Sequence, residues 1–278
     1  MKAFIKTAVI GHPVSHSKSP LIHRTWIAQY GLQGSYEALD LAPENLEKGV
    51  AHLIAEGYTG FNITVPHKEA VMAMCDVLEP QAMEIGAVNT VFMEDGLIKG
   101  MNTDAYGFLH NILDQVPAFS FAGKQAVVLG AGGAARAVIR GLLDQNVAQI
   151  HLLNRTRDKA ESLVRHFSAP LESVIKVTDW GNRHAVLRGV DLLVNTTSLG
   201  MTGQPALDLD LTALPQAALV NDIVYAPLYT ALLLQAETRG NPVVTGIGML
   251  LHQARPAFQK WFGVLPEVTP ALKALVSS

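Results

Sequence analysis

The chain has 278 residues, of which 49% are hydrophobic and 16% charged, and its formal net charge is −3. This balance is typical of a globular protein with a substantial core and excludes a mainly disordered chain. Lysine and arginine form no cluster, so we expect no nucleic-acid partner. The single cysteine, Cys75, excludes an intramolecular disulfide, and its apolar neighbours predict a buried packing residue.

No apolar segment of the sequence is long enough to cross a membrane. His12 and Pro13 end the first apolar run too early for a signal-peptide core. Arg136 and Arg140 interrupt the longest apolar candidate, which therefore falls short of the ~18 residues of a membrane-spanning helix. We expect a cytoplasmic protein without a membrane partner.

Short apolar runs alternate with amphipathic segments in the first part of the chain. The pattern predicts strands at residues 4–10, 35–41 and 60–65, and helices at residues 19–30, 43–56 and 68–75. Strands that alternate with helices are typical of a parallel α/β sheet with helices on both faces.

The same alternation starts again after the turn-rich segment at residues 114–124. It predicts strands at residues 125–129, 150–153, 190–195 and 218–224, a helix at 134–143 and, after a second turn-rich segment, a helix at 249–262. We therefore predict an α/β protein of two domains. The first comprises residues 1–104 and 246–278 with a mainly parallel sheet, and a Rossmann-like domain of residues 105–245 is inserted into it, so that the C-terminal helices return to the first domain.

A glycine-rich turn lies in the segment AVVLGAGGAARAV, between a predicted strand and a predicted helix. Gly130, Gly132 and Ala135 match the dinucleotide-binding pattern G-x-G-x-x-[G/A], in which the residues allow a tight turn, approach to a pyrophosphate and close helix packing. The start of the helix also offers free N–H groups to phosphate oxygens. Strand, turn and helix together predict a dinucleotide site.

The second strand of this predicted unit runs into NRTRDK, at the distance where NAD enzymes place a carboxylate on the ribose. Asn154 is neutral, and Arg155 and Arg157 supply the positive charge that a 2′-phosphate needs. Thr156 adds a hydroxyl, and Lys159 falls on the first turn of the next helix. We favour NADP over NAD, the alternative being an ordinary solvated helix start.

Two potential proton-transfer groups follow predicted strand ends. Lys68 comes just after the strand in FNITVPHK, and Asp104 follows another strand in GMNTDAYGF. Ligands of parallel α/β sheets bind at the carboxyl ends of the strands, where such a pair could exchange a proton with an alcohol oxygen. A single lysine or aspartate at such a position is more often a surface group or a helix cap.

Ser17 and Ser19 are two residues apart in GHPVSHSKSP. In an extended segment they would face the same side and suit a carboxylate or a polyol. Ser19 would also serve as the N-cap of a helix that begins at Pro20, and both roles remain open.

Together these segments resemble the shikimate dehydrogenase family. The resemblance spans residues 9–255 and rests on PVSHSKSP, NITVPHK, GAVNT, NTDAYGF, GAGGAARAV, NRT, NTTSLGM, DIVY and GIGMLLHQA, in this order. It implies reversible reduction of 3-dehydroshikimate to shikimate with NADPH, a step of aromatic amino-acid biosynthesis. We therefore expect a small polyhydroxy acid as the binding partner. We also expect that the protein can form a homodimer.

The resemblance also implies roles for matching positions. Lys68 would be the general acid and base, with Asp104 as its partner. The other substrate contacts would be Ser17, Ser19, Thr64, Asn89, Tyr225 and Gln253. NADP would contact Gly130, Ala131, Gly132, Gly133, Ala134, Asn154, Arg155, Thr156, Arg157, Asp158, Lys159, Ile223, Gly246 and Met249.

Three positions carry qualifications. Met249 and Gln253 are one helical turn apart, so one helix face could meet cofactor and substrate, although Met249 could equally be a core residue. Thr196 and Leu199 stand where the family often has smaller residues, and we expect both beside the cofactor.

Other functions remain to be weighed against this one. A quinate/shikimate dehydrogenase of broader specificity that uses NAD is disfavoured by Arg155 and Thr156. A methylenetetrahydrofolate dehydrogenase fits the serine pair less well, and a non-catalytic NADP(H)-binding regulator should lack Lys68 and Asp104. His12, His16 and His23 lack a supporting carboxylate pattern, so we expect no metal.

Overall fold

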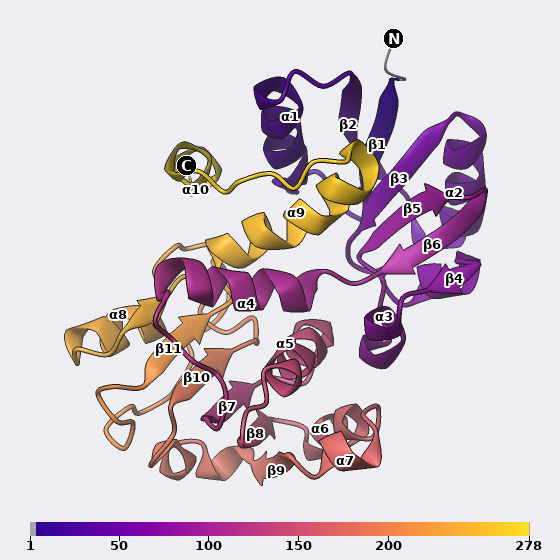
Figure 1. Ribbon diagram of the computed structural model, residues 1–278. Helices are drawn as coiled ribbons and strands as arrows, with labels where there is room; N and C mark the ends of the chain where they lie inside the picture. Colours follow the sequence, from indigo (N-terminus) through magenta and orange to yellow (C-terminus); the bar gives the residue numbers. More distant parts are fainter. Residues whose placement is uncertain (1–3, 278) are drawn as a thin grey trace. The chain divides into compact units, whose positions relative to one another are not determined.

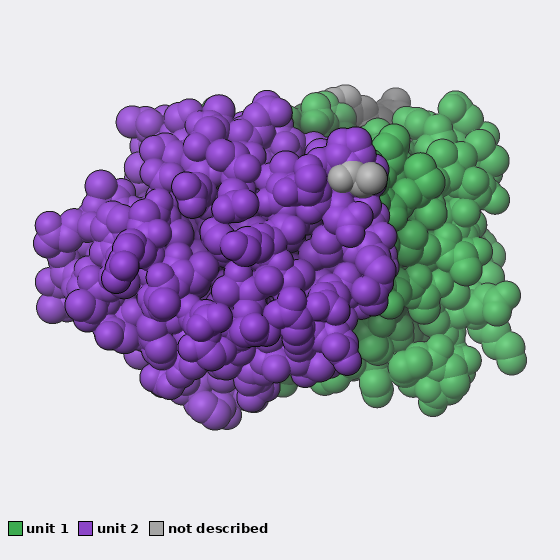
Figure 2. Space-filling model, turned by 90° about the horizontal axis from the view of Figure 1, so that it is seen from below, with its two compact units in different colours: residues 1–103, 251–278 green, residues 104–250 purple. Residues whose placement is uncertain are grey.

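The computed structural model describes residues 4–277. The chain forms two compact units, residues 1–103 with 251–278 and residues 104–250 (Figure 2). It leaves the first unit just before Asp104 and returns to it after Leu250, inside a helix. The sequence predicts the two boundaries one residue later and five residues earlier, because turn-rich sequence is the signal for a boundary and a helix interior carries none.

The sheet of the first unit has the strand order β2-β1-β3-β5-β6-β4 (Figure 1). Strands β1, β2 and β3 are parallel, and β5 runs antiparallel to both β3 and β6. The strands are β1 Ile5–Gly11, β2 Gly34–Asp40, β3 Tyr58–Ile63, β4 Val77–Leu78, β5 Thr90–Glu94 and β6 Leu97–Met101. The sheet is therefore mainly but not wholly parallel.

The antiparallel part is a hairpin that the pattern of alternating strands and helices did not predict. Asp95 and Gly96 connect β5 to β6 with φ values of 56° and 77°. Two successive residues with positive φ are typical of the tight hairpin turn that Asp-Gly favours. The sequence MEDGLIKGM thus contained a hairpin signal.

The helices predicted at residues 19–30 and 249–262 begin within two residues of the predicted positions, and the one predicted at 43–56 is shorter than predicted. The helix predicted at 68–75 is replaced by a 3₁₀ turn, and the helices at 80–85 and 270–277 were not predicted. The helices of the first unit are α1 Ser19–Gln29, α2 Leu46–Ala55, α3 Pro80–Ile85, α10 Pro270–Ser277 and most of α9 Ile247–Phe262. Residues 43–45 and 70–74 form 3₁₀ turns in place of the start of one helix and the whole of another. In the second case the Lys68 carbonyl accepts a hydrogen bond from the Val88 N–H, so it is not available to a helix starting there.

The sheet of the second unit is parallel throughout and has the order β12-β11-β10-β7-β8-β9 (Figure 1). Its strands are β7 Gln125–Leu129, β8 Gln149–Asn154, β9 Ile175–Asp179, β10 Leu192–Asn195, β11 Leu219–Asp222 and β12 Val243–Val244. The chain builds outward from β7 in both directions, as in dinucleotide-binding folds. The strand order therefore reverses between β7 and β10.

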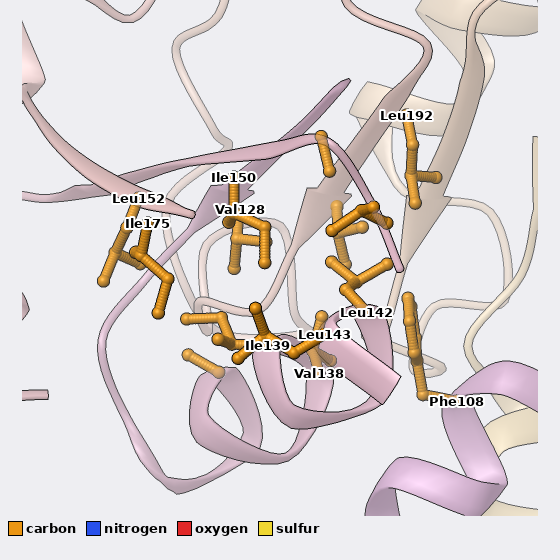
Figure 3. Close-up of a cluster of buried hydrophobic side chains, with 14 of the residues drawn as sticks. Phe108, Val128, Val138, Ile139, Leu142, Leu143, Ile150, Leu152, Ile175 and Leu192 are labelled. Carbon is orange, nitrogen blue, oxygen red and sulfur yellow. The ribbon is translucent and has the colours of Figure 1, made fainter. Parts of the chain in front are cut away.

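Both faces of this sheet are buried. Val128 faces the larger hydrophobic cluster, which includes Phe108, Val138 and Leu142 (Figure 3), whereas Val127 and Leu129 face a second cluster. The helices of the unit are α4 Asp104–Gln115, α5 Gly133–Asp144, α6 Arg157–Val164, α7 Ala169–Glu172 and α8 Ala231–Thr238, with 3₁₀ turns at Trp180–Asn182 and Ala185–Leu187. Strands buried on both faces read as continuous apolar runs, which is why β7 was predicted with its observed limits. Among the described residues, no helix has the length and apolar character that a membrane crossing requires.

Candidate active site

Several candidate substrate residues lie at one edge of the first sheet. Strands β1, β2, β3 and β6 point their carboxyl ends to this edge, and antiparallel β5 begins there. Thr64 and Lys68 follow β3, and Asn89 directly precedes β5. Asp104 follows β6 by three residues and is the first residue of α4. The edge is the ligand-binding position of parallel α/β sheets.

A buried network of hydrogen bonds fixes two of these residues. The Asn89 side chain donates to Thr103 Oγ1 at 3.0 Å and accepts from the Thr103 N–H at 3.0 Å. Thr103 Oγ1 in turn donates to Gln253 Oε1 at 3.4 Å. On its other side Asn89 accepts from Asn62, whose own Oδ1 accepts from the Tyr36 hydroxyl at 2.7 Å. Asn89 and Gln253 therefore share Thr103 as a common neighbour.

Ser17 and Ser19 lie near the start of α1 in an arrangement that differs from the prediction. Helix α1 begins at Ser19, its N-cap is Lys18, and no side chain caps it. Lys18 has φ −84° and ψ −4°, so the segment is not extended and alternation does not set the two hydroxyls on one side. Instead Ser17 Oγ accepts a hydrogen bond from the Ser19 N–H at 3.3 Å. The capping role of Ser19 was thus wrong.

Histidine side chains are also held at this edge. His12 Nδ1 lies 2.6 Å from Asp40 Oδ1, and His67 Nε2 lies 2.7 Å from the Leu41 carbonyl oxygen. Hydrogen bonds from His12 and the Val14 N–H lower the pKa of the Asp40 carboxyl. His12 therefore does have a carboxylate neighbour, contrary to the sequence reading. Within residues 4–277, no group of three or more metal-ligating side chains is gathered.

A second candidate site is a pocket of about 270 Å³ in the second unit, at the carboxyl ends of its central strands. It is lined by Gly130, Ala131, Gly132, Asn154, Arg155, Trp180, Thr196, Thr197, Ser198 and Leu199. These residues lie at or just after the ends of β7, β8, β9 and β10, and the strand order reverses between β7 and β10. Open α/β sheets bind ligands at this reversal.

The glycine turn after β7 fits a dinucleotide. Gly130 has φ +105°, and a Cβ there would lie 2.7 Å from Thr196 Oγ1, so only glycine meets both demands. Gly132 is the N-cap of α5, and a Cβ there would meet no protein atom within 4 Å. A side chain at this position would stand in the pocket space that a pyrophosphate needs.

The two arginines after β8 differ in their surroundings. Arg157 Nε lies 2.7 Å from Glu161 Oε1, and its Nη1 lies 2.5 Å from Asp179 Oδ1. Arg157 does not line the pocket. Arg155 does line it, and within the described part of the chain it pairs with no carboxylate. Arg155 is therefore the uncompensated cation of the pocket.

The remaining cofactor candidates divide into two groups. Gly133, Ala134, Thr156, Asp158 and Lys159 lie at the starts of α5 and α6 but do not line the pocket. By contrast, Ile223 and Met249 pack against the larger core cluster, and a Cβ on Gly246 would lie 2.4 Å from the Ile223 carbonyl oxygen. The structure thus brings Ile223 and Gly246 together. Met249 is half-buried against this cluster, so it contributes to core packing.

Tyr225 lies in the loop after β11, two residues after Ile223, and is 38% exposed. Its ring is therefore accessible to a ligand. The pocket also includes Trp180, Thr197 and Ser198, which the sequence reading did not single out, whereas Thr196 and Leu199 were expected near the cofactor. Trp180 was not predicted as a pocket residue, because strand β9, which directly precedes it, was not predicted.

Comparison with known proteins identifies the family. Three family profiles match successive parts of the chain: shikimate dehydrogenase substrate binding domain over residues 9–91, shikimate / quinate 5-dehydrogenase over 113–201, and shikimate 5′-dehydrogenase C-terminal domain over 246–276. A relative from Paramagnetospirillum magneticum, named shikimate dehydrogenase (NADP(+)), is 52% identical over 97% of both chains.

Solved structures agree with this assignment. Shikimate 5-dehydrogenase from Thermus thermophilus, in complex with NADP(H) and shikimate, is 36% identical with a TM-score of 0.85 over 99% of this chain and 98% of that one. The ligand-free 5-ketofructose reductase of Gluconobacter sp. strain CHM43 is 31% identical, with a TM-score of 0.90 over the same shares. With a close relative matched along nearly its whole length and all three family profiles in order, the chain belongs to the shikimate dehydrogenase family.

Proposed function

We propose that this protein catalyses the reversible NADP-dependent reduction of 3-dehydroshikimate to shikimate, a step of aromatic amino-acid biosynthesis. The observation that carries the proposal is the pocket after β7, which joins a glycine turn to Arg155, a cation without a carboxylate partner in the described chain. An NAD site would place a carboxylate where Asn154 stands. The relatives named for NADP and shikimate support the same coenzyme and substrate.

The pocket residues divide the work of holding NADP. The turn at Gly130–Gly132 and the start of α5 suit the pyrophosphate, because the first N–H groups of a helix have no partner within the helix and the Cβ position of Gly132 is open. Arg155 suits the 2′-phosphate, since a guanidinium binds phosphate in a planar, bidentate manner. Lys159 is exposed one turn into α6 and is proposed as a secondary cation. Ile223, Gly246 and Met249 are proposed for the nicotinamide end.

The edge of the first sheet is proposed to bind the substrate. Ser17 and Ser19 would bind its carboxylate, and Thr64, Asn89 and Gln253 its ring hydroxyls or its carboxylate. Tyr225 is proposed as a further contact. The reduced nicotinamide supplies a hydride to the carbonyl carbon when bound.

Lys68 is proposed to donate the proton that the carbonyl oxygen needs, with Asp104 as the acidic group that works with it. A fixed ammonium charge would also stabilise the developing alkoxide. In the direction of oxidation the same amine would accept the proton of the alcohol. These roles need one amine and one carboxylate, which both follow strands that end at this edge.

The proposal is tested by following coenzyme reduction in parallel reactions. Purified protein is mixed with NADP or NAD and with shikimate, quinate or no acid, and the product is identified by chromatography. We expect NADP reduction with shikimate far above the other combinations. Equal rates with quinate and NAD would favour the broader quinate/shikimate activity, and no rate with either acid would remove the proposal.

We further propose that the protein works in the cytoplasm as a homodimer with small-molecule partners only. Strand β2 supports the assembly, because within residues 4–277 it lies at one end of the sheet of the first unit and pairs with β1 alone. Such an open edge is a ready surface for another chain. Analytical ultracentrifugation across a concentration series tests this, and a single monomeric species would contradict it.

A further inference from the structure

Asp222, the last residue of β11, is a carboxylate with no exposed surface. Its Oδ1 accepts hydrogen bonds from Asn195 Nδ2 and from the Val224 N–H, each at 3.0 Å. Its Oδ2 accepts from Thr230 Oγ1 at 2.7 Å. Every one of these donors is neutral. The carboxylate is therefore held by oriented dipoles and not by an ion pair.

Asn195 connects this carboxylate to the wall of the nucleotide pocket. Its Oδ1 accepts from the Thr197 N–H at 3.1 Å and from Thr197 Oγ1 at 2.7 Å. Its Nδ2 also donates to the Leu199 carbonyl at 3.2 Å, and Thr197 Oγ1 accepts from the Leu199 N–H at 3.1 Å. Residues 196–199, here called the 196–199 loop, line the pocket, whereas Asn195 and Asp222 do not.

The same carboxylate also fixes the chain on its other side. The Val224 N–H that it binds belongs to the loop after β11, between Ile223 and Tyr225. The Ile223 N–H donates to the Asn195 carbonyl at 3.1 Å. Thr230, its third partner, is the N-cap of α8. One side chain thus connects the loops that follow two neighbouring strands.

Burying the Asp222 carboxylate lowers the stability of the fold. Burial raises the pKa of the Asp222 carboxyl, and the hydrogen bonds from Thr230, Val224 and Asn195 oppose that rise. A buried ionisable group without a cation is disfavoured unless hydrogen bonds satisfy it, and an apolar side chain would avoid the penalty. A carboxylate at this position has one structural advantage: its two oxygens hold the donors of Asn195, Val224 and Thr230 in one geometry.

We propose that Asp222 is a positioning residue for the coenzyme, which acts through Asn195 to hold the 196–199 loop as a wall of the nucleotide pocket. This inference rests on the proposed function, because it assumes that the pocket after β7 binds NADP. Asp222 itself would not touch the coenzyme. Its effect should therefore appear in coenzyme affinity and depend on Asn195.

The test compares three variants with the natural protein. Asp222→Ala removes both acceptor oxygens and leaves the donors of Asn195 and Val224 unsatisfied. Asp222→Asn keeps an acceptor for these two donors, because the Thr230 hydroxyl can turn and accept from the new amide. Asn195→Ala removes the connection to the 196–199 loop and leaves the carboxylate in place.

NADPH affinity is measured directly, by calorimetry or by the change in nicotinamide fluorescence, without substrate. We expect Asp222→Ala to weaken NADPH binding on the order of tenfold, because the pocket wall is no longer held. Asp222→Asn should recover most of this loss. Asn195→Ala should weaken binding to a similar extent, and the double variant should lose little more than either single one.

Asn241→Ala is the matched control. Asn241 is buried in the same unit and donates to the carbonyls of Pro215, Gln216 and Ala218, away from the pocket. It should lower the thermal midpoint as Asp222→Ala does and leave NADPH affinity unchanged. Equal loss of affinity in Asn241→Ala would reduce Asp222 to a structural role and overturn the inference.

The outcomes separate this inference from the function on which it rests. If the natural protein does not bind NADPH, the proposed function fails. If it binds NADPH and Asp222→Ala binds equally well, or if the two single losses add in full, the positioning role is wrong. Should Asp222→Ala fail to fold, Asn195→Ala decides by itself, since an unchanged affinity in that variant contradicts the proposed connection.

Discussion

Arg155 and Arg157 are two residues apart, and their surroundings give them different tasks. Arg157 is held between two carboxylates, whereas Arg155 lines the nucleotide pocket without such a partner in the described chain. A guanidinium already paired with acidic groups has fewer donors to offer a phosphate. Coenzyme choice should therefore depend on the first arginine and hardly on the second.

Replacing Arg155 tests this division. Arg155→Ala should raise the Michaelis constant for NADPH roughly tenfold or more, because a charge-assisted contact with the 2′-phosphate is lost, and should leave that for NADH nearly unchanged. Arg157→Ala is the control and should alter neither constant strongly, since exposed ion pairs contribute little. Initial rates at saturating substrate measure both. Equal effects of Arg155→Ala on the two coenzymes would contradict the assignment.

Lys68 gives a second prediction at this scale. Lys68→Ala should lower turnover by about 10²-fold or more with the Michaelis constant for shikimate largely kept, because proton transfer and alkoxide stabilisation act on the transition state. Steady-state kinetics with shikimate and NADP measure both constants. Lost binding with turnover nearly intact would make Lys68 a binding residue instead.

Local patterns in the sequence identified candidate residues, whereas the partners of these residues could not be predicted. The glycine turn and the NRT segment predicted a nucleotide site because local patterns specify both. The ion pair of Arg157 with Asp179 could not be predicted, since Asp179 comes from a strand that was not recognised. Trp180 was missed because it follows the same unrecognised strand. Asp222 lies in a predicted strand, but its contacts with Asn195 and Thr230 form only in the folded chain.

At the scale of elements, the turn between β7 and α5 is constrained on both sides. Gly130 has φ +105°, its N–H donates to the Leu153 carbonyl, and its α-carbon faces Thr196. Thr196 is fixed in turn, because its hydroxyl donates to the Leu129 carbonyl at 2.6 Å. Neither side of this contact can move without breaking a backbone-linked hydrogen bond.

Gly130→Ala should therefore affect both stability and coenzyme binding. We expect the free energy of unfolding to fall by about 1–3 kcal/mol from the backbone strain alone, and NADPH affinity to fall as the added Cβ displaces Thr196. Gly189→Ala is the control, because Gly189 has φ +77° but no atom near its Cβ position. It should lose stability and keep NADPH affinity. Thermal unfolding and calorimetry measure the two quantities, and equal affinities in both variants would contradict the clash.

Elements were predicted well where a single pattern decided them. The limits of β7 agree with the structure because a continuous apolar run is a local signal. Helix α1 begins at Ser19, one residue before the start that the Ser-Pro pair indicated. The β5–β6 hairpin was missed although Asp95-Gly96 signals its turn, because the regular alternation of strand and helix was extended over it. Strand order in either sheet could not be predicted, since pairing joins segments far apart in the chain.

At the scale of the whole molecule, one buried histidine should shape how stability depends on pH. His23 in α1 has no exposed surface, and its ring stacks on Tyr36 with centroids 4.1 Å apart. Trp26, Phe258 and Trp261 complete the aromatic surroundings. Burial lowers the pKa of this ring and outweighs the opposing effect of the nearby Asn62 side chain. The first unit therefore buries a neutral imidazole.

Burial lowers the pKa of His23 to about 3, whereas an exposed histidine in the unfolded chain has a pKa near 6.5. Between these two values the unfolded chain binds a proton that the folded chain does not. The free energy of unfolding is therefore greatest above pH 6.5 with respect to this group. It should fall by up to ~1.4 kcal/mol per pH unit as the pH decreases toward 3.

His23→Phe should weaken this dependence, because phenylalanine fills the aromatic site and carries no titrating group. Chemical unfolding of both proteins between pH 4 and pH 7 measures the free energy of unfolding, and the difference between them should change in favour of the variant as the pH falls. His52→Gln, at an exposed position of α2, is the control and should follow the natural protein. The slope is the quantity that decides, because the substitution also changes packing and so shifts the stability at every pH alike. Parallel curves for the natural protein and His23→Phe would mean that the ring gains its proton over the same pH range in the folded and the unfolded chain. The loss of stability in acid would then have to arise from carboxylates such as Asp40. Its lowered pKa also makes the free energy of unfolding fall with pH, but at lower pH.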